Sequence, residues 1–273
     1  MDLTGFMHGD EGSLEKCTEC GVTVRSEERA AQYENDTYDH ELLEVLYPRY
    51  RDAFRRKERG YKCLLRPRAE VLEVGSHLGA FLEVGEEWGW HPTGVDVGWD
   101  TTRFARKRGA RVLRGTIETV NLPAYRADAV FAWNCFEQLE NPTSALAAAH
   151  RLLKRHGLLV VRTPNIAFYY RARAAWRAGV TRQLRSLAYN NLLGFPYLAG
   201  YDPGTLSEFL RSCGFDPLLG FNSSIIVVPY PDITPRLKLE IESLRPSFAD
   251  TFAQAPAELK GPWIEILARK RDA

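Results

Sequence analysis

Short apolar runs alternate with amphipathic stretches along the middle of this 273-residue chain. The apolar runs are short enough to be strands, and the stretches between them carry apolar residues at helical spacing. Strands of continuous apolar character separated by helices predict a parallel sheet that is covered on both faces. The runs that predict strands are residues 71–74, 93–97, 111–114, 127–133 and 158–161.

Capping residues mark several of the predicted helices. Asn141 followed by Pro142 predicts the start of a helix whose last turn holds residues 154–156, with Gly157 after it. Asp100 is expected to cap a helix that ends near residue 108. Other expected helices are 39–59, 166–178, 181–192, 204–213 and 235–245, and the remaining expected strands are 221–228 and 263–269. The fold class expected is therefore α/β, with a Rossmann-like, mostly parallel seven-stranded sheet and helices on both faces.

The composition divides the chain into two parts and an insertion. Residues 1–68 are polar and end in a basic stretch, 49–68, with nine basic and two acidic residues. Residues 69–273 carry the alternating pattern and form the main domain. An insertion at 165–201 contains no acidic residue but five arginines. We expect this insertion to be a helical lid over the substrate cavity of the main domain.

Overall charge and cysteine content exclude several classes of protein. The chain has 36 basic and 35 acidic residues, so no global field steers it to nucleic acid or to an anionic membrane. Its apolar runs are too short for a transmembrane helix, and its start lacks the pattern of a signal peptide. Five cysteines without regular spacing do not form a disulfide framework. A cytoplasmic protein that does not act at a membrane is expected.

The turn after the first predicted strand has the features of a nucleoside site. Gly75 permits a tight turn, and Gly79 allows the backbone to approach a ligand at a helix N-terminus. Asp96 ends the next predicted strand, 21 residues (96 − 75) after Gly75. Ligands of open α/β sheets bind at the carboxyl ends of the strands, where such a carboxylate can accept ribose hydroxyls.

Two kinds of cofactor compete for this turn. A dinucleotide site needs a second glycine at position 77, where this chain has His77. S-adenosylmethionine has no pyrophosphate and tolerates a side chain there. Glu73, two residues before Gly75, also favours the positively charged amino-acid end of S-adenosylmethionine.

With these residues in place, the sequence resembles the class I S-adenosylmethionine-dependent methyltransferases over about residues 70–270. Within that class it is similar to small-molecule enzymes of the ubiquinone-biosynthesis group. The matching segments are 71–76 (VLEVGS), 94–96 (GVD), 115–118 (GTIE), 128–142 (DAVFAWNCFEQLENP), 151–157 (RLLKRHG) and 163–165 (TPN).

The resemblance implies a role for each matching residue. The first turn would wrap the methionine end of the cofactor, and Asp96 would bind its ribose. Val97 would pack on the adenine, and residues 116–118 would hold its edge. The residues after the fourth strand would line the methyl-transfer cavity. The cofactor-binding residues implied are Glu73, Gly75, Ser76, His77, Gly79, Asp96, Val97, Thr116, Ile117, Glu118, Asn134, Phe136 and Gln138.

The resemblance does not extend to a catalytic metal. Metal-binding relatives carry Glu-x-x-Glu-His after the fourth strand, and residues 134–138 here lack two of those three ligands. Near the N-terminus, Cys17 and Cys20 form half of a zinc-ribbon pattern, similar to ribbons that precede some methyltransferase domains. A structural zinc needs four ligands, so we expect a degenerate ribbon with free thiols, and a structural zinc is the alternative.

The catalytic and acceptor-binding residues carry weaker signals. Position alone makes Glu137, Tyr169 and Tyr170 candidates for the general base, although a polar pair at 137–138 is also typical of a helix cap. Arg173 and Arg177 of the expected lid would bind an anionic small-molecule acceptor. The alternative for these arginines is a solvated helix face.

Three functions remain compatible with the sequence. The first is transfer of a methyl group from S-adenosylmethionine to a small-molecule acceptor. The second is an NAD(P)-dependent oxidoreductase, which His77 disfavours. The third is a non-catalytic protein that binds S-adenosylmethionine or a partner. Binding of nucleic acid through residues 49–68 is not favoured, because few aromatic residues accompany the basic ones.

Overall fold

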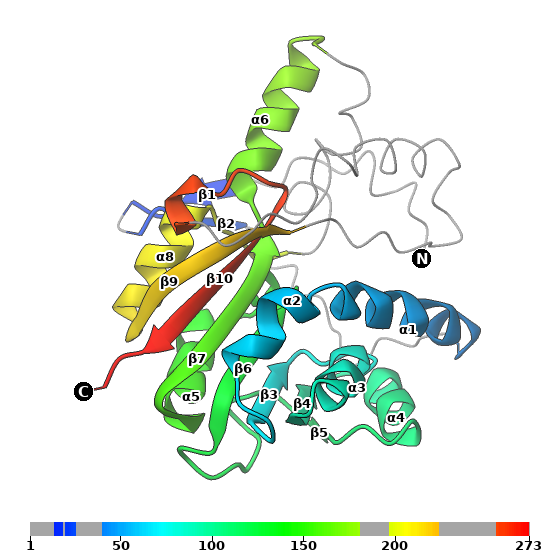
Figure 1. Cartoon of the computed structure of the whole chain (residues 1–273). Helices are drawn as coiled ribbons and strands as arrows, with labels where there is room; N and C mark the ends of the chain where they lie inside the picture. The colour runs from blue at the N-terminus through cyan, green and yellow to red at the C-terminus, as the bar shows by residue number, and fades with distance from the viewer. Residues whose placement is uncertain (1–13, 19, 26–39, 181–196, 224–254, 273) are drawn as a thin grey trace.

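The computed structural model describes residues 14–18, 20–25, 40–180, 197–223 and 255–272 of the chain. A single large sheet forms its centre, with helices packed on both sides (Figure 1). Within these residues no helix combines the length and the apolar character needed to cross a bilayer. The helices predicted at 181–192 and 235–245 lie outside the described residues.

The central sheet has seven strands in the order β5-β4-β3-β6-β7-β10-β9. The first five strands in this order run parallel to one another, and β10 is antiparallel to both β7 and β9. The predicted mostly parallel sheet is therefore confirmed. The strands are β3 (Glu70–Val74), β4 (His91–Asp96), β5 (Val112–Arg114), β6 (Ala127–Trp133), β7 (Leu153–Pro164), β9 (Phe215–Ser223) and β10 (Trp263–Lys270).

Helices cover the two faces of this sheet with separate apolar cores. One core joins α1, α3 and α4 to side chains such as Phe131 and Val160. The other joins α5 and α8 to side chains such as Val130 and Val161. Since neighbouring residues of one strand enter different cores, both faces are buried, which explains the continuous apolar strands. The helices and 3₁₀ turns are α1 (His40–Arg55), α2 (Glu58–Tyr61), η3 (Lys62–Leu64), α3 (Ala80–Glu87), α4 (Trp99–Lys107), η4 (Phe136–Gln138), α5 (Pro142–Leu152), α6 (Ile166–Arg177), α8 (Pro203–Ser212) and η8 (Pro256–Glu258).

The predicted helix over residues 39–59 is present as α1 and α2, and Pro48 lies inside α1. Its apolar side packs on α3, with Leu43 and Phe54 buried, and Phe54 also reaches Trp133 of β6. Its basic side meets acids of α3, since Arg51 and Arg55 form ion pairs with Glu83 and Glu87. Part of the basic stretch therefore has partners within the domain.

Three predicted boundaries were wrong. α5 ends at Leu152, and the residues expected in its last turn start β7 instead. Leu153 is fully buried and pairs with Ala127, while Lys154 reaches Asp128 at 2.7 Å. Burial and cross-strand pairing thus outweigh the helix C-terminal signal. α4 is capped at Gly98 rather than Asp100, and β9 begins at Phe215, earlier than expected.

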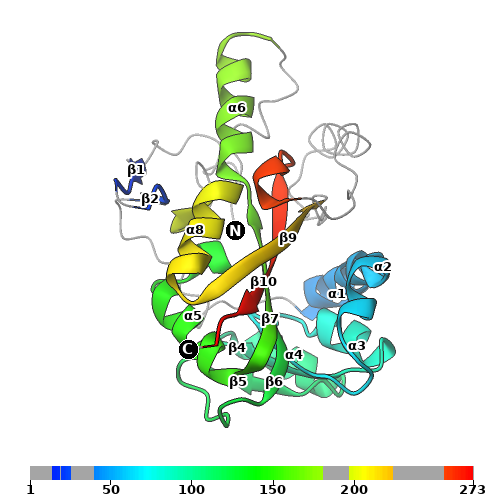
Figure 2. The ribbon, with the colours of Figure 1, turned by 60° about the vertical axis from the view of Figure 1, so that its left-hand side comes forward.

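A second, small sheet was not predicted. It consists of β1 (Leu14–Lys16), β2 (Thr23–Arg25) and β8 (Ala199–Gly200), all antiparallel. Figure 2 shows it beside α8, with α6 projecting from the end of β7 beyond the body of the domain. β8 precedes Tyr201, whose ring packs 5.3 Å from that of Phe136. The N-terminal hairpin is in this way joined to the carboxyl edge of the large sheet.

Candidate functional site

Two loops meet at the carboxyl edge of the central sheet. The turn after β3 and the loop after β6 are neighbours because β3 and β6 are paired. The Cys135 thiol donates to the Val74 carbonyl at 3.1 Å. A Cβ atom at Gly75 would lie 2.7 Å from the Cβ of Cys135, so only glycine fits. The structure thus brings the predicted cofactor turn against the loop that holds Asn134, Glu137 and Gln138.

The turn after β3 has the left-handed backbone that its glycines predict. Gly75 and Gly79 have φ of 68° and 73°, and Gly79 is the N-cap residue of α3. His77 has φ 46°, so it takes the left-handed conformation that the usual glycine would take. Its ring packs edge-on against Tyr50 of α1 at 5.7 Å, and burial lowers the pKa of the imidazole. The backbone of this turn therefore keeps its shape despite the histidine.

Asp96 organises the edge of the site. One carboxylate oxygen accepts the main-chain N–H of His77 at 2.7 Å. The other accepts from the N–H of Gly98 at 2.9 Å and the hydroxyl of Thr101 at 3.1 Å. Since a carboxylate offers about four acceptor positions, about one is left for a ribose hydroxyl. Asp96 thus fixes the turn after β3 and the backbone that leads into α4, and its binding of a ribose stays a prediction.

Glu73 is a buried carboxyl with an unsatisfied oxygen. It is 3% exposed, and its Oε2 atom has no hydrogen-bond partner among the described residues. Burial, with a contribution from Asp96, raises the pKa of this carboxyl well above its ordinary value. A buried carboxyl of this kind is costly unless a ligand supplies a donor or a positive charge. The charged amino-acid end of S-adenosylmethionine fits this requirement.

Glu137 lies in η4 and is 1% exposed, with neither carboxyl oxygen hydrogen-bonded in the described part of the chain. Burial raises its pKa to about 7, and the nearby Thr163 and Arg162 limit the rise. Its carbonyl accepts the N–H of Leu198 at 2.9 Å. A carboxyl with a pKa near neutrality can accept a proton in catalysis.

Other predicted cofactor residues have different surroundings. Ser76 is buried, and Val97, the residue after β4, is partly buried. Thr116 and Glu118 are exposed, whereas Ile117 belongs to the apolar core. Phe136 also lies in that core, where its ring packs against Tyr201.

The candidate residues of α6 differ in exposure. Tyr169 is buried and Tyr170 is 40% exposed. Arg173 is half-buried and Arg177 is exposed. α6 follows β7 after one residue, so it starts at the same edge of the sheet as the cofactor turn.

Cys17 and Cys20 lie in the turn between β1 and β2. Gly21, with φ 73°, donates its N–H to the Cys17 carbonyl at 2.9 Å, and burial raises the pKa of Cys20. Across the residues that the structure describes, no three His, Cys, Asp or Glu side chains are grouped to hold a metal ion.

One buried network of charges was missed in the sequence. Arg162 of β7, Glu265 of β10 and Lys57, between α1 and α2, are each at most 9% exposed. Lys57 pairs with Glu265, and Arg162 lies 3.4 Å from the same carboxylate. The signal was available, because Arg162 and Glu265 are charged residues that border apolar runs of their strands.

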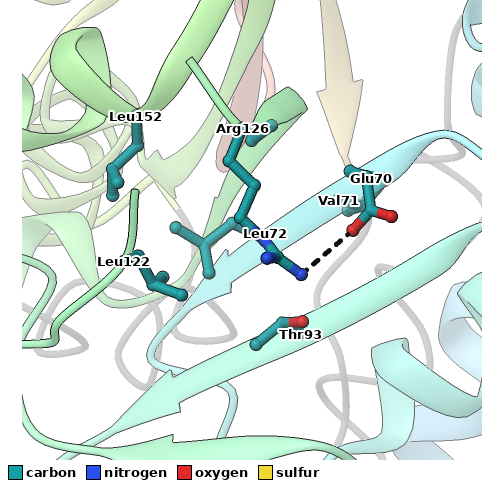
Figure 3. A pocket seen from close by; sticks show the side chains of 8 residues that line it. Glu70, Val71, Leu72, Thr93, Leu122, Arg126 and Leu152 are labelled. Atoms are coloured by element: carbon teal, nitrogen blue, oxygen red, sulfur yellow. Dashed lines mark hydrogen bonds and ion pairs between the residues drawn. The ribbon is translucent and has the colours of Figure 1, made fainter. Parts of the chain in front are cut away.

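A small pocket at the opposite edge of the sheet does not belong to this site. It is lined by residues such as Glu70, Thr93 and Leu122, and Arg126 pairs with Glu70 across it at 3.3 Å (Figure 3). Its volume is about 10 Å³, which is about the space of one water molecule.

Comparison with known proteins agrees with this arrangement. A family described as "Methyltransferase domain" matches residues 46–219, more than half of the chain. No curated protein matches. Among solved structures, a methyltransferase from Archaeoglobus fulgidus aligns with TM-score 0.55 and 21% identity over 81% of this chain and 94% of its own. One from Thermotoga maritima aligns with TM-score 0.53 and 20% identity over 84% of this chain and 91% of its own.

A third solved structure, the plantazolicin methyltransferase BamL in complex with S-adenosylhomocysteine, aligns with TM-score 0.50 and 14% identity over 83% of this chain and 86% of its own. At these identities the structural likeness establishes the fold, and the family match establishes membership. The chain belongs to the methyltransferase-domain family and has the fold of the class I S-adenosylmethionine-dependent methyltransferases.

Proposed function

We propose that this S-adenosylmethionine-dependent methyltransferase acts on a small-molecule acceptor at the carboxyl edge of its central sheet. The turn after β3 would hold the cofactor, and Glu137 would act as general base. The resemblance to the ubiquinone-biosynthesis group supports a small molecule as the methyl acceptor. The family match favours this function over the oxidoreductase alternative.

The observation that carries this proposal is the unsatisfied carboxyl of Glu73. It lies two residues before Gly75, is nearly fully buried, and has one oxygen without a partner in the described ranges. An ammonium group placed there would supply the missing donor and the compensating charge. The stabilisation expected for such a charge-assisted hydrogen bond is about 1.5–3 kcal/mol.

The chemistry requires little more than positioning and a base. S-adenosylmethionine supplies an activated methyl group when bound. The protein must exclude water, orient the acceptor and remove its proton. Burial of Glu137 leaves its carboxyl about half ionised near pH 7, so it can take that proton and return to its starting state. Tyr169, buried on α6, is the second candidate for this role, and the exposed Tyr170 is the weakest.

The acceptor would enter beside α6. Arg173 and Arg177 lie on this helix, which has no acidic residue, and they would bind a carboxylate or phosphate of the acceptor. Replacement of either by alanine should raise KM for the true acceptor. The ion pairs between α1 and α3 support the view that nucleic acid is not the acceptor.

Calorimetric titration with S-adenosylhomocysteine tests the cofactor site. Glu73→Gln should weaken this ligand but not 5′-methylthioadenosine, which has the same nucleoside and no amino-acid end. Asp96→Ala should weaken both ligands, because the ribose is common to them. Wild-type protein that binds neither ligand would contradict the proposed function, and equal loss of both in Glu73→Gln would contradict the role of Glu73.

A further inference from the structure

The buried charge network ends on Asn134, at the carboxyl edge of the sheet. Arg162 is 1% exposed, and its Nε donates to the hydroxyl of Ser223 at 2.9 Å. Its Nη1 donates to the side-chain oxygen of Asn134. The main-chain N–H of Asn134 in turn donates to the Arg162 carbonyl at 3.1 Å. Arg162 therefore holds Asn134 by both its backbone and its side chain.

Contact with a guanidinium decides which way the amide of Asn134 faces. A guanidinium has only donors, so the amide oxygen and not the amide nitrogen must be the end that meets Arg162. The two N–H donors are on the other end of the amide, and no described residue accepts a hydrogen bond from them. Asn134 thus has its acceptor satisfied and its donors available.

These donors lie in the loop that touches the cofactor turn. Asn134 directly precedes Cys135, whose thiol contacts Val74 and whose Cβ limits position 75 to glycine. Asn134 has φ 55°, a left-handed conformation, and its carbonyl accepts from the side chain of Gln138 at 2.7 Å. The residue is therefore held through its side chain and its backbone, next to the turn that follows Glu73 and β3.

We propose that Arg162 is a positioning residue, which orients Asn134 so that its amide donates a hydrogen bond to the carboxylate of the cofactor's amino-acid end. This inference rests on the proposed cofactor site. The positive charge of Arg162 behind the amide also favours an anionic group in front of it. Glu73 then selects the ammonium and Asn134 the carboxylate of the same zwitterion.

Binding of S-adenosylhomocysteine and 5′-methylthioadenosine to matched variants tests this role. Asn134→Asp keeps an oxygen for Arg162 and tolerates the left-handed backbone, but it loses both donors and adds a like charge. It should weaken S-adenosylhomocysteine by about tenfold or more and leave 5′-methylthioadenosine unchanged. Arg162→Gln should weaken S-adenosylhomocysteine in the wild-type background but not further in an Asn134→Gly background, because it acts through Asn134.

Ser223→Ala is the control for damage to the network, since it removes a partner of Arg162 but not its contact with Asn134. It should leave both ligands unchanged. The inference is wrong if Asn134→Asp binds S-adenosylhomocysteine normally, or if Asn134→Asp loses both ligands equally. Asn134→Asp decides the matter even if Arg162→Gln does not fold. Wild-type protein that binds neither ligand would overturn the proposed function as well.

Discussion

Replacement of Glu137 by glutamine should change how the stability of the protein depends on pH. The carboxyl has an ordinary pKa of 4.5 and a pKa of about 7 in the folded protein, because burial disfavours its charged form. Below pH 4.5 the carboxyl is protonated in both the folded and the unfolded chain, so its burial does not lower the free energy of unfolding through ionisation. Between pH 4.5 and 7 it ionises only in the unfolded chain, so the free energy of unfolding falls as pH rises. Above pH 7 the loss is constant.

The size of this loss follows from the pKa difference. A shift of about 2.5 units at 1.36 kcal/mol per unit corresponds to about 3 kcal/mol. Glu137→Gln has the same shape and no charge to bury, so it should be more stable than the wild type at pH 8. The stability gained by the variant should be larger at pH 8 than at pH 5 by about 2.5 kcal/mol. The same variant should lose methyl transfer, since it removes the proposed base.

Urea denaturation of both proteins at pH 5 and pH 8, followed by tryptophan fluorescence, measures this difference. Glu118→Gln makes the same chemical change at an exposed side chain and should follow the wild type at both pH values. If Glu137→Gln gains the same stability at pH 5 as at pH 8, the carboxyl does not titrate in this range. The argument for Glu137 as the base would then be refuted.

Three further predictions concern the cofactor turn. Because the pKa of Glu73 is raised, this carboxyl should release a proton when an ammonium binds, so the affinity for S-adenosylhomocysteine should rise with pH. Calorimetry in two buffers of different ionisation enthalpy should show the released proton. Glu73→Gln should abolish both the proton release and the pH dependence. His77→Gly should be more stable to urea than His77→Ala by about 1 kcal/mol, because only alanine keeps the strain of a left-handed residue; equal stability would refute this. Gly94→Ala places a Cβ 2.6 Å from that of Ser76 and should lower the stability by about 1–3 kcal/mol. The control Gly85→Ala adds a Cβ with no contact under 3.5 Å and should leave the stability unchanged. Thermal unfolding of the two variants measures the difference.

Local patterns were sufficient to predict most of the central sheet and the cofactor turn. Apolar runs such as 127–133 are strands because both of their faces are buried, a property that any arrangement of neighbours would preserve. Gly75 and Gly79 were recognisable because a tight turn imposes a left-handed backbone on particular positions. Asn141 and Pro142 were sufficient to start α5, since a helix N-terminus is satisfied by residues next to it in the chain.

Long-range contacts determined the remaining features. Basic residues after Leu152 resemble a helix end, yet Leu153 before them and Leu158 after them pair with β6, and this places them in a strand. The pKa of Glu137 depends on burial, limited by two side chains of β7 that are about 25 residues away in the chain. The amide of Asn134 is oriented by Arg162, which is joined to Glu265 and Lys57 from two other parts of the chain. Such properties arise from electric fields and packing between segments that are distant in the chain. Local sequence patterns do not reveal them, because the segments become neighbours only in the folded protein.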